Sequence, residues 1–366
     1  MELHGGIIGV GQVVCEYAWP GYRASDTDIC IDRIGNLHDR EGTVRELEKR
    51  MEVSSRERES IEDILRCIDD GTTTVHQAGG NGFQDDTFFK GLDFVYLATP
   101  NWIRKGFVEQ AARAGVAMIL EKPIGHDAPT ARYVADMLHN VRAICAEHYS
   151  YKSPSLWMFE EIPEMGAIER IECCLEEPDF LEAERYQWLF DRDKSGGGIW
   201  LDTGIHMMHL INLAGARASS TIDAYGYSHP FASSDPRANH INGEVAAHVR
   251  VSLESGEKNV MPGAEAEIYV AKCMPKAQKY FRITYEQGKV LLDFCKNSVL
   301  VAENEQVLPK TDPYAQMFER FADHIRSGRD SPTSMDRAAV STDMVFEVYR
   351  QMANGRSHAE YAGGRI

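Results

Sequence analysis

The sequence predicts an α/β domain built on a doubly wound parallel sheet, followed by an α+β domain with a mostly antiparallel sheet. Three observations lead to this fold class. Short apolar strands alternate with helical segments through about the first 150 residues, strands joined by short turns dominate the rest, and 366 residues are enough for two ordinary domains. We place the boundary so that the domains span 1–148 and 149–366.

The strands expected in the first domain are short, apolar and bounded by loop-forming residues. They are placed at 5–9, 27–32, 72–76, 92–98, 116–120 and 143–147. Two of the helical segments between them, 37–53 and 55–69, carry apolar residues at helical spacing among many Glu and Arg residues. Buried strands that alternate with helices indicate a parallel sheet covered on both faces.

The second domain begins with a different pattern. Alternating strands are expected at 167–176, 220–227, 243–253, 264–271, 279–285 and 289–294. Tight turns such as 254–256 join them, which favours antiparallel pairing. Helices are expected at 154–162, 200–214, 314–327 and 336–353.

Composition excludes several classes of protein. A formal net charge of −17 repels nucleic acid and anionic membrane surfaces, and no apolar run reaches the length of a membrane span. The first 14 residues lack the features of a signal peptide. The eight cysteines show no CxxC pair and no zinc spacing, so we expect buried thiols in a reducing cytoplasm and no metal site.

A glycine-rich turn follows the first strand. Gly9 permits a tight turn, and Gly11 lets a pyrophosphate approach the backbone where the helix begins at Gln12 and Val13. A third small residue is expected next, but Val14 stands there, so the dinucleotide fingerprint is incomplete.

The second strand carries the next cofactor signal. Asp32 is expected to end this strand about 20 residues after the glycines, where an acid binds the ribose hydroxyls and favours NAD. Arg33 follows and can pair with the 2′-phosphate of NADP instead. The sequence therefore favours NAD and leaves NADP open.

Two turns end later strands of the same sheet. Thr99-Pro100-Asn101 is expected to line the nicotinamide side, with Asn101 as a hydrogen-bonding group. Glu121-Lys122-Pro123 ends the next strand, where open α/β sheets bind ligands, so Glu121 and Lys122 are also candidate cofactor-binding residues. The Lys122 ammonium there can stabilise alkoxide character on a substrate oxygen.

A cluster in the second domain completes the predicted chemistry. Three glycines, 196–198, precede a helical segment and let a ring approach the backbone closely. Asp202 and His206 are four residues apart, on one helix face, and His206 suits proton removal from a hydroxyl. His209 lies on much the same face, so a metal site is an alternative, but the sequence suggests no fourth ligand.

At these residues the chain resembles the glucose–fructose oxidoreductase, inositol dehydrogenase and MocA family. The matching motifs are Gly9-Val10-Gly11, Ala98-Thr99-Pro100-Asn101, Glu121-Lys122-Pro123 and the segment 196–206. The resemblance implies a Rossmann domain, an open-faced sheet that often forms a homodimer or homotetramer, and a catalytic group of Lys122, Asp202 and His206. The chain departs from the family at Val14, at Arg104 and His209, where a histidine and an acid are common, and in the long charged stretch 36–90.

The predicted function is NAD(P)-dependent hydride transfer at a carbinol carbon of a sugar, glycoside, sugar phosphate or cyclitol. Tyr149, Arg185, Trp188 and His209 are the candidate substrate-binding residues, with Tyr151, Lys152 and Trp157 as further pocket residues. Alternatives are a glycosidase or epimerase that oxidises transiently, a reductase for a non-sugar ketone or imine, and a non-catalytic NAD-binding regulator.

Overall fold

The computed structural model of the chain describes residues 2–55, 57–178, 195–228, 243–272, 274 and 276–357. The chain forms two compact units. The first comprises 1–125, 132–151 and 311–336, and the second comprises 126–131, 152–310 and 337–366. The segment 311–336, from the last part of the sequence, therefore belongs to the first unit, which a single division of the chain after residue 148 does not anticipate.

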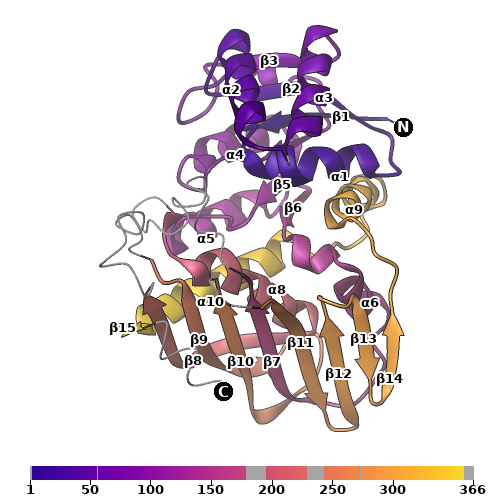
Figure 1. Ribbon diagram of the computed structural model, residues 1–366, viewed down its shortest axis with the longest axis vertical. Coiled ribbons are helices and arrows are strands. Elements are labelled where there is room, and N and C mark those ends of the chain that lie inside the picture. Colours follow the sequence, from indigo (N-terminus) through magenta and orange to yellow (C-terminus); the bar gives the residue numbers. More distant parts are fainter. Residues whose placement is uncertain are drawn as a thin grey trace. The chain divides into compact units, whose positions relative to one another are not determined.

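A six-stranded, fully parallel sheet forms the centre of the first unit (Figure 1). Its strands, in spatial order, are β3 (Thr74–Gln77), β2 (Ile29–Asn36), β1 (Leu3–Ile8), β4 (Phe94–Leu97), β5 (Ala117–Glu121) and β6 (Ala143–Ala146). The chain adds strands on one side of β1 and then on the other, so the strand order reverses between β1 and β4. Ligands of doubly wound sheets bind at such a switch point, and the predicted fold class is confirmed.

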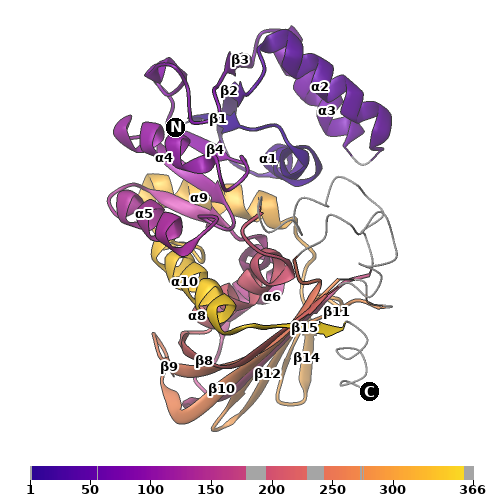
Figure 2. The same cartoon turned by 90° about the vertical axis from the view of Figure 1, so that its left-hand side faces the viewer.

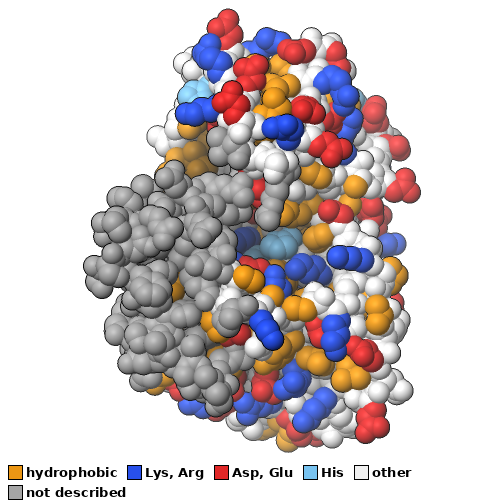
Figure 3. Space-filling model, viewed as in Figure 1, with side chains coloured by type: hydrophobic (Ala, Val, Ile, Leu, Met, Phe, Trp, Pro, Cys, Tyr) orange, Lys and Arg blue, Asp and Glu red, His pale blue; other side chains and the backbone are white. Residues whose placement is uncertain are grey.

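Helices flank this sheet: α1 (Trp19–Ala24), α2 (Arg40–Val53), α3 (Arg58–Asp69), α4 (Arg104–Arg113), α5 (Ala128–Leu138) and α9 (Pro313–Ser327). The charged stretch predicted after β2 forms α2 and α3, which lie side by side as a hairpin (Figure 2). Acidic and basic side chains intermingle over this part of the surface, at the top of Figure 3.

Helix α9 supplies part of the first unit's core. Asp312 caps it by accepting hydrogen bonds from the main-chain nitrogens of Tyr314 and Ala315. Its buried Phe321 ring packs edge-on against Phe94 of β4, with centroids 5.4 Å apart. Burying an aromatic side chain of this size contributes about 3 kcal/mol, so the sheet depends on this late segment of the chain.

The second unit is built on a nine-stranded sheet. Its order is β14 (Asn304–Val307), β13 (Ser298–Val301), β12 (Gly288–Asp293), β11 (Gln278–Tyr285), β7 (Ile168–Glu176), β10 (Val260–Ala271), β9 (Ala246–Ser255), β8 (Ala216–Ser228) and β15 (Ala353–Ser357). All neighbours are antiparallel except β10 with β7 and β15 with β8. The predicted mostly antiparallel sheet is confirmed, while β13, β14 and β15 were not predicted.

Helices α6 (Ser153–Glu161), α8 (Ile205–Leu213) and α10 (Met335–Gln351) lie on one side of this sheet (Figures 1 and 2). Strand side chains alternate accordingly: Val249 and Val251 are buried, while His248 and Arg250, which alternate with them, are partly exposed on the other face. In the part of the chain that the structure describes, no helix is long and apolar enough to cross a membrane.

Candidate functional site

The glycine loop after β1 has the shape expected of a phosphate-binding turn. Gly9 has a φ of +89°, and a Cβ atom there would lie 3.1 Å from the main-chain oxygen of Ala98, so the loop passes close to the end of β4. A Cβ atom on Gly11 would have no neighbour within 4 Å, so space is open beside this residue. The helix starts here, with the Cys15 nitrogen bonded to the Gly11 oxygen at 3.1 Å.

The residue that stands in place of the third glycine is packed inside the protein. Val14 is fully buried, and the helix begins with a π-helical turn, Val14–Ala18, before continuing as α1. Gln12, whose side chain donates to Glu16 at 2.9 Å, and Val13 form the first residues after the loop. The predicted loop residues thus lie together at the helix start.

The prediction that Asp32 ends the second strand is wrong. Strand β2 continues to Asn36, so four residues of the strand, about 13 Å of chain, separate Asp32 from the carboxyl edge. The Asp32 side chain instead contacts His4, with Nδ1 and Oδ2 2.9 Å apart, near the start of β1. Asp32 therefore does not lie at the carboxyl end of β2.

Arg33 is also engaged elsewhere. Its guanidinium donates hydrogen bonds to the main-chain oxygens of Phe88 and Lys90, at 2.6 and 2.8 Å, in the loop before β4. The residue that ends β2 is Asn36, whose amide donates to Thr43 at 3.2 Å and to the Glu46 carboxylate at 3.1 Å. A carboxylate from α2, which the sequence analysis missed, thus stands at the end of this strand.

The turn after β4 is closely packed. Thr99 and Asn101 are buried, and Pro100 between them is exposed. The main-chain oxygen of Thr99 accepts a hydrogen bond from Arg104 at 2.7 Å, which fixes the turn to the start of α4.

The turn after β5 carries Lys122, joined to Pro123 by a cis peptide bond. Glu121, which the sequence analysis assigned to the cofactor, is 6% exposed and points into the protein, where it accepts hydrogen bonds from the hydroxyls of Tyr96 and Tyr314. Burial raises the pKa of Glu121, although the Tyr96 hydrogen bond opposes this rise. Glu121 thus hydrogen-bonds to buried tyrosines, whereas Lys122, the next residue in the chain, is partly exposed.

Arg104, where the family commonly has a histidine, joins these two turns. Its buried guanidinium donates to the main-chain oxygens of Thr99, Glu121 and Pro123. Burial lowers the pKa of Arg104, but an arginine keeps its charge over the ordinary pH range. The residues on either side of Lys122 are therefore tied to a fixed, charged donor.

The end of β6 adds residues that the sequence analysis did not single out. Glu147 is fully buried and accepts a hydrogen bond from the Tyr149 nitrogen at 3.0 Å. The His148 ring is stacked on Tyr314, with centroids 6.0 Å apart and an interplanar angle of 12°. An acid and a histidine directly after a buried strand were the available signal. Tyr149, a predicted substrate-binding residue, is 3% exposed.

In the second unit, the three glycines are packed closely against other parts of the protein and do not leave an open backbone surface. Gly196 has a φ of +88°, and a Cβ atom there would lie 2.2 Å from the main-chain oxygen of His126. A Cβ atom on Gly198 would overlap the backbone of Glu244. The Tyr349 hydroxyl accepts from the Gly198 nitrogen at 2.9 Å and donates to Glu244 at 2.7 Å.

The helical segment that follows carries the predicted acid and base. Asp202 lies in a π-helical turn, Trp200–Gly204, and is partly exposed, while His206 lies at the start of α8 and is 4% exposed. π-helical turns are rare and frequently occur at functional sites. Gly204 leaves room for the Trp200 ring, because a Cβ atom there would lie 2.3 Å from it.

The structure therefore gathers the predicted residues in two groups. The first unit holds the glycine loop, Thr99–Asn101 and Lys122 at the carboxyl ends of neighbouring strands. The second unit holds Asp202, His206 and the buried His209. Arg185 and Trp188 lie outside the described residues. The convergence of Lys122 with the second group stays a prediction.

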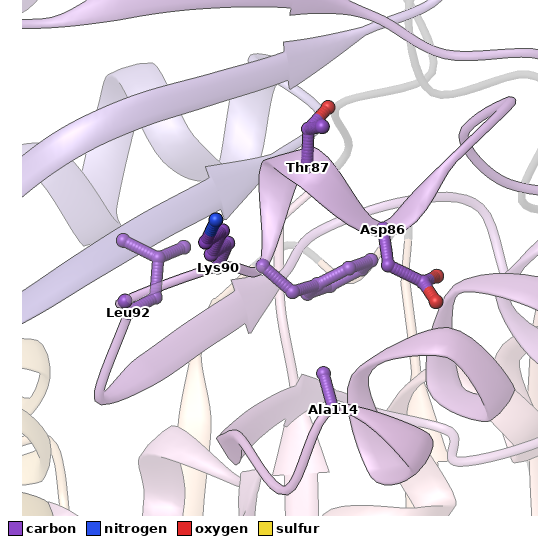
Figure 4. A pocket seen from close by; sticks show the side chains of 7 residues that line it. Asp86, Thr87, Lys90, Leu92 and Ala114 are labelled. Atoms are coloured by element: carbon purple, nitrogen blue, oxygen red, sulfur yellow. The ribbon is translucent and has the colours of Figure 1, made fainter.

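One surface pocket lies at the opposite edge of the first sheet. Figure 4 shows Asp86, Thr87, Lys90, Leu92 and Ala114 around it. These residues precede β4 and β5, so the pocket lies at the amino ends of the strands and is separate from the candidate site.

Comparisons with known proteins agree with this architecture. No family model matches the chain. The chain is 26% identical over 209 residues to the D-xylose 1-dehydrogenase (NADP+) of Haloarcula marismortui, a match that covers 56% of this chain and 51% of that protein. The match thus spans about half the length of this curated relative.

Two solved structures match over nearly the whole chain. The UDP-N-acetylglucosamine 3-dehydrogenase GnnA of Acidithiobacillus ferrooxidans has a TM-score of 0.71 at 17% identity, covering 96% of this chain and 98% of that chain. KijD10, a 3-ketoreductase of Actinomadura kijaniata in complex with NADP and TDP-benzene, has a TM-score of 0.69 at 14% identity, covering 97% and 99%. These likenesses confirm the predicted fold.

Proposed function

We propose that this chain, which has the fold of the glucose–fructose oxidoreductase, inositol dehydrogenase and MocA family, is a nicotinamide-dependent oxidoreductase of sugar-like substrates. One observation carries the proposal. The glycine loop, Thr99–Asn101 and Lys122 follow the adjacent parallel strands β1, β4 and β5 at one edge of the sheet. A dinucleotide phosphate site, a ribose-side turn and a cation thus share the edge where such sheets bind ligands.

The loop fits a dinucleotide. Its backbone is open beside Gly11, and a helix begins there, so main-chain N–H groups and the helix dipole favour a pyrophosphate. When bound, the nicotinamide accepts or delivers the hydride. The chain's own residues bind and orient the substrate and move its proton.

Three side chains have distinct roles in the proposed reaction. Lys122 binds the reacting oxygen and stabilises its negative charge as the C–H bond breaks. His206 takes the hydroxyl proton during oxidation and returns it during reduction. Asp202 holds a substrate hydroxyl or orients the imidazole. The substrate class is a sugar, glycoside, sugar phosphate or cyclitol, in line with the sugar substrates named for the relatives.

We also propose that Glu46 takes the role that the sequence analysis gave to Asp32. Its carboxylate lies next to Asn36 at the carboxyl end of β2, where an acid binds ribose hydroxyls and repels a 2′-phosphate. We therefore expect kcat/KM to be higher with NAD than with NADP. Glu46→Gln should lower the ratio of kcat/KM with NAD to kcat/KM with NADP. A wild-type preference for NADP would refute this assignment.

Two substitutions test the proposed mechanism. Lys122→Ala and His206→Ala should each lower turnover at least about 100-fold, because each removes a positioned acid–base or charge-stabilising group. Lys105→Ala and His139→Ala, at exposed positions of the first unit, are the matched controls. Near wild-type turnover of the two test variants would refute the mechanism.

The alternatives predict different outcomes with a panel of sugars, cyclitols and glycosides. A dehydrogenase accumulates reduced cofactor with a single substrate, whereas a glycosidase or epimerase that oxidises transiently does not. A regulator binds the dinucleotide and turns over no substrate. Thermal shifts with each cofactor and sugar identify the ligands before kinetics begin.

A homodimer or homotetramer through the second sheet is part of the proposal. The face opposite the helices carries partly exposed polar residues, among them His248, Arg250 and Glu267. Glu267 accepts from Arg170 at 2.6 Å and lies 3.0 Å from His248, so charges on this face are paired within one copy. Light scattering of the wild type and of Glu267→Lys tests it: we expect an oligomer that Glu267→Lys weakens, and a monomeric wild type would refute it.

A further inference from the structure

We propose that Arg50, on the charged hairpin α2–α3, is a positioning residue for the dinucleotide: it orients the glycine loop and balances the acidic groups around it. This inference rests on the proposed function. It gives a role to the charged stretch that sets this chain apart from the family pattern.

Arg50 contacts the loop directly. Its Nη1 atom donates to the main-chain oxygen of Val10 at 2.8 Å, and Val10 is the residue between Gly9 and Gly11. The Cys15 thiol lies 3.7 Å from the same oxygen. This carbonyl is therefore held on the side of the loop that faces the hairpin.

The orientation of one peptide group explains why this contact matters. In a trans peptide, the carbonyl oxygen and the following N–H point in opposite directions. Fixing the Val10 oxygen toward Arg50 therefore directs the Gly11 N–H away from the hairpin. Since space is open beside Gly11, this N–H is presented to an incoming phosphate oxygen.

The hairpin that carries Arg50 is firmly anchored. The Arg50 guanidinium forms a two-point contact with the carboxylate of Glu57, whose side chain is 3% exposed. In α3, Asp63 accepts from the Trp19 indole at 2.9 Å and pairs with Arg23 at 2.9 Å. These contacts join the hairpin to the helix after the loop, so Arg50 is fixed on both sides.

Charge gives Arg50 a second role. Burial is the main reason that the pKa of the Cys15 thiol is raised to about 12. The nearby Arg50 guanidinium lowers this pKa, and the carboxylates of Glu57, Glu46 and Glu16 raise it further. The loop is thus surrounded by several carboxylates and this guanidinium. Without Arg50, the buried Glu57 carboxylate would lose this counter-charge close to the loop that would hold the pyrophosphate.

Binding of NAD and NADP to the full-length protein without substrate, by calorimetry, tests the inference. Arg50→Met should weaken binding at least about 10-fold, since it removes the contact and the charge together. Arg50→Lys should have an intermediate effect, because a lysine keeps the positive charge but lacks the several N–H donors of the planar guanidinium. Arg45→Met, on an exposed part of the same helix, is the control, since Arg45 pairs with exposed Glu41 in a surface contact at 3.5 Å.

The double variant Arg50→Met/Glu57→Gln separates the two roles. We expect it to bind more tightly than Arg50→Met, because the negative charge of Glu57 is also removed, and less tightly than the wild type. Affinities of Arg50→Met and Arg50→Lys equal to the wild type would overturn the inference. If Arg50→Met does not fold, wild-type affinity of Arg50→Lys and of the double variant would overturn it. A wild type that binds neither dinucleotide would refute the proposed function itself, whereas a wild type that binds and tolerates Arg50→Met refutes the inference alone.

Discussion

Arg104 donates a hydrogen bond to the main-chain oxygen of Glu121, so a buried cation at the start of α4 holds the last residue of β5. The same guanidinium also bonds the oxygens of Thr99 and Pro123. The turn that presents Lys122 is therefore supported by one side chain from the neighbouring strand–helix connection.

Replacing Arg104 with Met should lower stability and turnover together. Three main-chain carbonyl oxygens would lose a charged donor, which costs about 3 kcal/mol in the free energy of unfolding. Urea unfolding measures this cost, and Arg113→Met, at an exposed position of the same helix, is the control. Equal unfolding midpoints for Arg104→Met and the wild type would contradict the assigned role.

The pH dependence of stability should reveal the buried Glu121. Burial raises the pKa of this carboxyl in the native state, so the native state holds its proton more tightly than the unfolded state. The resulting contribution of Glu121 to the stability of the native state is complete below the ordinary pKa range of glutamate. It is lost as the pH rises through the native pKa of Glu121.

Glu121→Gln, which cannot titrate, is the reference for this measurement. The stability of the wild type relative to the variant should be lower at a pH well above the ordinary glutamate range than at a pH below that range. Urea unfolding at both pH values checks the sign. A relative stability that rises over the same interval would mean that the native pKa is lowered.

Gly196→Ala should be more damaging than an ordinary glycine substitution. Its positive φ opposes any side chain, and a Cβ atom would overlap the His126 oxygen, so we expect a loss of at least about 2 kcal/mol. Gly263, in the same unit, has a φ of +80° but no neighbour within 4 Å of a Cβ atom. Gly263→Ala should therefore cost only about 1 kcal/mol, from backbone strain alone. Thermal unfolding compares them, and equal losses would show that the overlap relaxes.

The sequence predicted what depends on local pattern. Strand–helix alternation identified the parallel sheet, and short motifs identified the turn at Gly9 and the turn at Lys122. The end of β2 was misjudged, because the predicted strand stops at Asp32. In the structure the strand continues to Asn36, and its last four residues pair with Thr74–Gln77 of β3. This pairing joins residues about 40 positions apart, and local periodicity does not reveal it.

The same limit applies to the residues that hold the turns and the glycine segment of the candidate site in place. Arg104 was noted only as a departure from the family pattern, because its partners are main-chain oxygens that have no signature in the sequence. Glu244 and Tyr349 were missed because they reach the glycine segment from distant parts of the chain. Arg50 was read as part of a charged helix face, which is the usual meaning of such a pattern.

The membership of 311–336 in the first unit affects how the protein is made. During synthesis the six strands of that unit leave the ribosome long before α9 does, and Phe94 then lacks Phe321 as its partner. The nascent first unit must wait for almost the whole chain before its core is complete. A fragment that stops near residue 150 should consequently aggregate, whereas the same fragment supplied with a linked copy of 311–336 should remain dispersed.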